Sequence, residues 1–113
     1  MNCRTCNYIN GKWVPSRNGK TLASINPARS HEIVGEVPDS DREDLNEAVS
    51  AARNAFAMWS GLSPVERGAY LQKAAEILEE RLEDIAVTAT REMGKILPET
   101  KGEVLRGAAI LRY

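Results

Sequence analysis

Residues 40–61 read SDREDLNEAVSAARNAFAMWSG, and the spacing of apolar side chains changes from that of strands to that of a helix at this stretch. Ser40 and Glu43 have the spacing of a capping box, and acidic residues fill the first turn, where the helix dipole favours them. Gly61 is a helix-ending residue. We therefore predict one amphipathic helix between Ser40 and Gly61. Its apolar stripe consists of Leu45, Ala48, Val49, Ala52, Phe56 and Trp59.

The residues before this helix have the turn and strand signals of a small sheet. Asn10-Gly11 supplies the two positive-φ positions of a tight turn, so residues 8–14 should form a hairpin. Asn18-Gly19 predicts a second turn, and residues 21–25 and 32–37 have strand-like composition. We expect a β-hairpin or meander that is too slight to stand alone.

The residues after Gly61 predict two or three more helices. Ser63-Pro64 has the signature of a helix start, and the apolar stripe that follows is long enough to require a bend or break near Arg81. Gly94 should end the helical stretch that carries this stripe, and Pro98 should begin the last helix. The predicted class is α+β: a hairpin or meander, then three to four amphipathic helices, with residues 1–7 as a disordered N-terminus.

The charge balance excludes several classes of partner. The 15 basic and 16 acidic residues are interspersed and give a formal net charge of −1, so we expect neither nucleic acid nor a membrane surface as a partner. No apolar run approaches the roughly 20 residues that span a bilayer, and the N-terminus lacks the apolar core of a secretory signal. A cytoplasmic location is the expectation.

Few residues suggest chemistry. Cys3 and Cys6 form a C-x-x-C pair, but a structural zinc site needs four ligands, and His31 is the single histidine. We therefore favour two reduced, exposed thiols over a small metal or redox protein, and we interpret His31 as a surface residue. A free-standing helical module that self-associates through its apolar stripes is a further alternative, although the last helix lacks a closing Gly or Asn.

Seven stretches, in this order, resemble the N-terminus of the NAD(P)-dependent aldehyde dehydrogenases. The last two are similar to the branch that oxidises semialdehydes such as 2-oxoglutarate semialdehyde. The stretches are YINGKWV, INPA, EIVGEVPDS, AVSAARNAFAMW, ERGAYLQKAAEILEERLEDIA, TREMGK and GEVLRGAAILRY.

This resemblance implies that residues 8–113 are an incomplete N-terminal part of the nucleotide-binding domain of an α/β enzyme, without the strands of its Rossmann-like sheet. In the family a cysteine thiolate attacks the aldehyde, hydride passes to the nicotinamide, and a glutamate activates the hydrolytic water. The matching positions fall outside this sequence, so we assign no catalytic or cofactor-binding residue. The complete enzyme is expected to use NAD or NADP and a small-molecule aldehyde, and this chain alone is expected to bind no cofactor and to be inactive.

The resemblance also implies two lesser sites and an assembly. Arg106 is expected to line the substrate entrance and to bind the far carboxylate of a semialdehyde acid. A structural sodium ion is expected to use the carbonyl region of Ser24 and Ile25 together with Glu92, since oxygen ligands suit a hard cation. The helices that should cover a larger enzyme body are expected to make the chain a homo-oligomer through their exposed faces.

Overall fold

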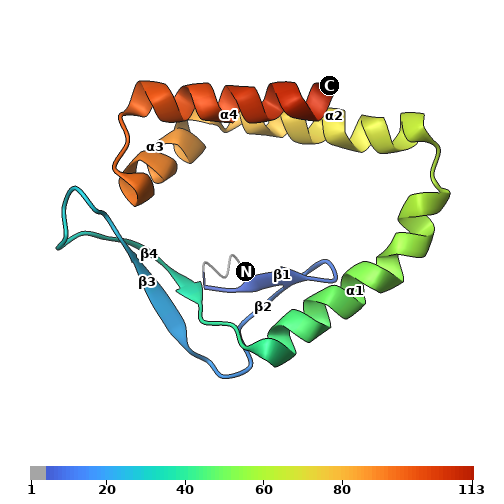
Figure 1. Cartoon of the computed structure of the whole chain (residues 1–113), viewed down its shortest axis with the longest axis horizontal. Coiled ribbons are helices and arrows are strands. Elements are labelled where there is room, and N and C mark those ends of the chain that lie inside the picture. Colours follow the sequence, from blue (N-terminus) through green and yellow to red (C-terminus); the bar gives the residue numbers. More distant parts are fainter. Residues whose placement is uncertain (1–4) are drawn as a thin grey trace. The chain divides into compact units, whose positions relative to one another are not determined.

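The computed structural model describes residues 5–113, which divide into two compact units (Figure 1). Unit 1 ends at Gly61 and contains four strands and one helix, but it excludes residues 26–32. Unit 2 consists of residues 26–32 and 62–113 and contains three helices. The predicted succession of short strands followed by four helices is therefore confirmed.

Unit 1 holds two separate two-stranded antiparallel sheets instead of one continuous meander. β1 (Asn7–Ile9) pairs with β2 (Lys12–Val14), and β3 (Thr21–Ile25) pairs with β4 (Ile33–Pro38). The β1–β2 turn has positive φ at Asn10 (51°) and Gly11 (75°), as the Asn-Gly pair predicts. Tyr8 and Trp13 face each other across this hairpin, with ring centroids 5.0 Å apart.

Helix α1 (Arg42–Gly61) begins one residue later than the predicted capping box places it. Asp41 is the capping residue: its Oδ1 accepts hydrogen bonds from the backbone N–H of Glu43 (2.9 Å) and of Asp44 (3.1 Å). The Asp44 carboxylate accepts in return from the N–H of Asp41 (3.1 Å). The prediction of Ser40 and Glu43 is therefore wrong in register, because Asp41 and Asp44 form the reciprocal pair.

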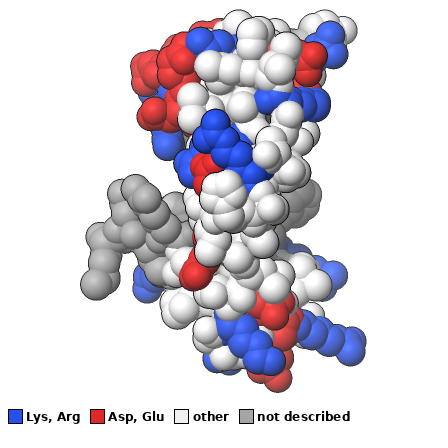
Figure 2. All heavy atoms as spheres, turned by 90° about the vertical axis from the view of Figure 1, so that its left-hand side faces the viewer, with Lys and Arg blue, Asp and Glu red and all other residues white. Residues whose placement is uncertain are grey.

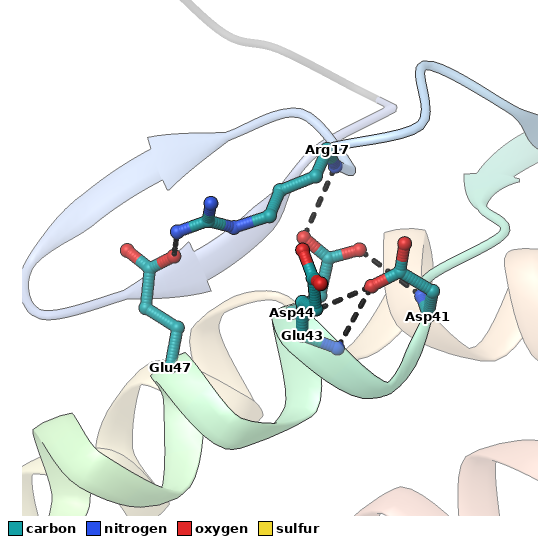
Figure 3. A network of polar contacts seen from close by, with 5 residues as sticks. All are labelled: Arg17, Asp41, Glu43, Asp44 and Glu47. Carbon is teal, nitrogen blue, oxygen red and sulfur yellow. Dashed lines mark hydrogen bonds and ion pairs between the residues drawn. The ribbon is translucent and has the colours of Figure 1, made fainter.

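Asp44 also connects α1 to the loop after β2. Its Oδ1 accepts a hydrogen bond from the backbone N–H of Arg17 at 3.1 Å, and Arg17 forms an ion pair with Glu47 at 2.9 Å (Figure 3). The Asp44 residue is only 4% exposed. One buried carboxylate therefore satisfies backbone donors of both the loop and the start of the helix.

Unit 2 is built from α2 (Pro64–Glu80), α3 (Leu82–Met93) and α4 (Leu97–Arg112). Ser63 and Glu66 form the predicted capping box of α2, and Gly94 ends α3 in the left-handed conformation at φ 74°. Arg81 separates α2 from α3, where the sequence predicts a break. α4 runs back along both helices: Arg112 pairs with Glu79 of α2, and Lys101 pairs with Glu83 of α3 (Figure 1).

Small residues fill the places where these helices meet. Ala75, Ala86 and Ala108 are each 0% exposed, and so is Thr100, whose hydroxyl lies 2.8 Å from that of Thr90. Alanine buries little apolar surface, so close helix contact must compensate. Many large apolar side chains remain exposed instead, among them Phe56 (64%), Met58 (76%), Val65 (82%) and Ile110 (67%).

Candidate functional site

Arg106 lies on α4, on the side of the helix away from its packed residues. The packed side is marked by buried Thr100 and Ala108, four residues to either side of Val104. Arg106 is exposed, and no hydrogen bond or ion pair joins its guanidinium to the part of the chain described here. Gly102, one turn before it, adds no side chain to this surface. The five N–H donors of the Arg106 guanidinium are therefore available for a carboxylate ligand.

The three residues expected at a sodium site are distributed over both units. Ser24 and Ile25 end β3 in unit 1, and Glu92 occupies the last turn of α3 in unit 2. Within residues 5–113 no cluster of three or more His, Cys, Asp or Glu side chains could hold a metal ion. The expected site relies on backbone carbonyls, which such a cluster does not include, so it stays a prediction.

Near the last turn of α3, Glu32 and Arg91 form an ion pair that sequence reasoning missed. The Glu32 carboxylate accepts hydrogen bonds from Arg91 Nε at 2.8 Å and from Asn26 Nδ2 at 3.0 Å. The bonds from Arg91 and then from Asn26 lower the pKa of Glu32. Glu32 and Arg91 are 59 positions apart in the chain, so no local pattern signals their contact.

The cysteine and histidine predictions have different outcomes. Cys6 is disulfide-bonded, so the expectation of a reduced thiol is wrong at this residue, and Cys3 lies outside the described residues. His31 is exposed, as predicted. Across residues 5–113 no helix is both long and apolar enough to cross a membrane. On the face shown in Figure 2, basic side chains lie beside acidic ones, as the interspersed charges of the sequence predict.

The sequence is similar to known semialdehyde dehydrogenases over nearly all of its length. Alpha-ketoglutaric semialdehyde dehydrogenase of Bacillus subtilis (strain 168) is 55% identical over 107 residues, which make up 95% of this chain and 22% of that protein. Malonate-semialdehyde dehydrogenase 2 of Geobacillus kaustophilus (strain HTA426) is 44% identical with the same coverage. The chain thus spans about a fifth of the length of these curated relatives.

Solved structures give the same result for the fold. The chain superposes on an NAD-dependent aldehyde dehydrogenase from Sinorhizobium meliloti with a TM-score of 0.94 and 30% identity, covering 100% of this chain and 23% of that one. A betaine aldehyde dehydrogenase from Staphylococcus aureus, solved in complex with NAD+, gives a TM-score of 0.91 and 31% identity, with 97% and 22% covered. Residues 13–113 also match the aldehyde dehydrogenase family as a whole, so the chain belongs to that family.

Proposed function

We propose that the chain is the N-terminal part of an enzyme that oxidises a semialdehyde acid to a dicarboxylate with NAD or NADP. The observation that carries this proposal is the 55% identity to an alpha-ketoglutaric semialdehyde dehydrogenase over 95% of the chain. The malonate-semialdehyde dehydrogenases among the relatives also act, by name, on aldehydes that carry a carboxylate. An aldehyde with a distant carboxylate is therefore the substrate class to test first.

Arg106 is the residue of this chain that we propose to contact such a substrate. Its guanidinium lies on the unpacked side of α4, and a planar guanidinium can bind a carboxylate through two parallel N–H···O bonds. We expect the catalytic thiolate, the glutamate that activates water and the nicotinamide site to come from the part of the complete enzyme that lies outside this chain. The role proposed for this chain is to support the site and to orient the acid end of the substrate.

The test uses an enzyme of full family length that begins with this sequence. Replacing Arg106 by Ala should raise KM for acidic semialdehydes about tenfold to a hundredfold, because a charge-assisted carboxylate contact is lost. KM for neutral aldehydes of similar length should change less than about twofold. NAD(P)H absorbance measures both, and the purified 113-residue chain, which we expect to be inactive, is the blank.

Two results contradict these proposals separately. Equal effects of Arg106→Ala on acidic and neutral aldehydes contradict the role of Arg106 but leave the reaction in place. Absence of semialdehyde-dependent NAD(P)H formation by the full-length enzyme contradicts the reaction itself. An Arg106→Lys variant keeps the charge but loses the planar fork, so partial recovery of KM is the expected control result.

We also propose that the complete enzyme holds a sodium ion, for which Ser24, Ile25 and Glu92 supply part of the ligand set. Carbonyl and carboxylate oxygens are the ligands that a hard cation prefers, and Glu92 is exposed at the end of α3. The helix-terminal carbonyls of this last turn add negative partial charge, which favours a cation.

We further propose that the isolated chain self-associates through its apolar helix faces. Exposed apolar side chains occur on α1 (Phe56, Met58), on α2 (Val65, Tyr70) and on α4 (Ile110), and exposed apolar surface promotes association. Light scattering of the purified chain should give a mass at least twice 12.5 kDa, and this mass should fall toward the monomer on dilution. A monomeric mass at every concentration would contradict the proposal.

A further inference from the structure

Residues 26–32 form a short segment that joins β3 to β4 but belongs to unit 2, and we call it the strap. Its own backbone closes it: the N–H of Asn26 donates to the Glu32 carbonyl (3.0 Å), and the N–H of Glu32 donates to the Arg29 carbonyl (2.8 Å). The N–H of Arg29 donates in turn to the Asn26 carbonyl at 3.1 Å. The strap is therefore a preformed turn and not an open loop.

Asn26 holds this turn from inside. It is 6% exposed, its Oδ1 accepts from the N–H of Ala28 at 2.9 Å, and its Nδ2 donates to Glu32 Oε2 at 3.0 Å. An Asn before a proline often caps a turn through its own side chain. Here the same amide also fixes the orientation of the Glu32 carboxylate.

The strap contacts the end of α3 in two places. Glu32 Oε1 accepts from Arg91 Nε (2.8 Å) and lies 2.7 Å from Arg91 Nη2. Pro27 approaches Gly94 so closely that a Cβ at position 94 would lie 3.1 Å from its Cγ. A hollow of about 370 Å³ lies between the strap and this end of α3, lined in part by Thr90 and Lys95.

We propose that the Glu32–Arg91 ion pair holds the strap against α3. Breaking this pair lets residues 26–32 open locally, away from α3, while α2, α3 and α4 stay folded. The three backbone bonds of the strap are internal to it, whereas its charged bonds to α3 converge on one carboxylate. A segment with this arrangement can open without breaking the backbone hydrogen bonds of any helix. Opening removes the wall of the hollow that the strap provides and uncovers the surface at Thr90 and Lys95.

Trypsin cleavage after Arg29 measures the opening, because Arg29 lies inside the strap and cleavage requires its backbone to extend. Arg91→Gln removes the partner without altering the sequence that the protease contacts. We expect it to raise the rate of cleavage at Arg29–Ser30 on the order of tenfold, with an unchanged far-ultraviolet circular dichroism spectrum. Mass spectrometry identifies the product that begins at Ser30.

Two further variants complete the experiment. Arg53→Gln removes an exposed arginine of α1 and should leave the cleavage rate within about twofold of the parent. Glu32→Gln should expose the Arg29 amide to hydrogen exchange at least as much as Arg91→Gln, because it also weakens the bond from Asn26, and adding Arg91→Gln to Glu32→Gln should change the exchange little further. An unchanged cleavage rate in Arg91→Gln overturns the proposal. Loss of helical circular dichroism along with faster cleavage overturns it too, since the opening is then not local.

Discussion

Replacing Asp44 by Ala should lower the free energy of unfolding by about 2 kcal/mol, because two part-buried backbone N–H groups lose their carboxylate acceptor. Asp44 is 4% exposed, and its carboxylate accepts from the N–H groups of Arg17 and Asp41, each at 3.1 Å (Figure 3). Alanine leaves both donors without this acceptor. Urea titration of the 113-residue chain, extrapolated to water, measures the loss.

Two substitutions in the same turn serve as controls. Asp44→Asn keeps one carbonyl oxygen but places an amide N–H group against the other donor, so about half of the loss is expected. Glu43→Ala changes an exposed neighbour that shares the first turn, and its effect should stay within about 0.5 kcal/mol. If Asp44→Ala and Glu43→Ala prove equally mild, the network around Asp44 does not stabilise the link between the loop and α1.

Replacing Ala108 by Leu should destabilise unit 2 by about 3 kcal/mol, at the upper end of the usual cost of overpacking. Ala108 is 0% exposed and lies on α4, which packs along α2, where Ala75 is equally buried. A larger side chain has no space there unless the helices separate. The measurement is again urea unfolding, here followed by the helical circular dichroism signal.

Ala109→Leu is the matched control for this substitution. Residue 109 is exposed, lies next to 108 on the same helix, and undergoes the same chemical change. Alanine and leucine have nearly the same helix propensity, so the stability should change by less than about 0.5 kcal/mol. Equal losses at the two positions would mean that the close contact of α4 with its neighbours does not contribute the expected stability.

The local features of this fold could be predicted because their causes are local. Asn10 and Gly11 tolerate positive φ, Gly94 tolerates the left-handed cap, and Ser63 with Glu66 satisfies the first donors of α2. The predicted start of α1 is wrong by one residue because Ser40 and Asp41 are both good caps. The choice between them depends on Asp44, whose carboxylate also accepts from the distant Arg17.

The long-range contacts could not be predicted for a related reason. Glu32 and Arg91 each have ordinary sequence surroundings, and their pairing depends on how residues 26–32 fold onto α3. The buried hydroxyl pair of Thr90 and Thr100 likewise depends on the path of α4. At the candidate site, the sequence located Arg106 on a helix, and the structure adds that its side of α4 is unpacked.

The placement of the aromatic residues gives the chain a built-in optical label. Its two tryptophans, Trp13 on β2 and Trp59 on α1, both belong to unit 1. Unit 2 contains tyrosine, at positions 70 and 113, but no tryptophan. Tryptophan emission therefore reports the environment of unit 1 only, and Trp13 lies against the Tyr8 ring in the first hairpin. A shift in that emission without any change at Tyr70 and Tyr113 would separate the melting of unit 1 from that of unit 2.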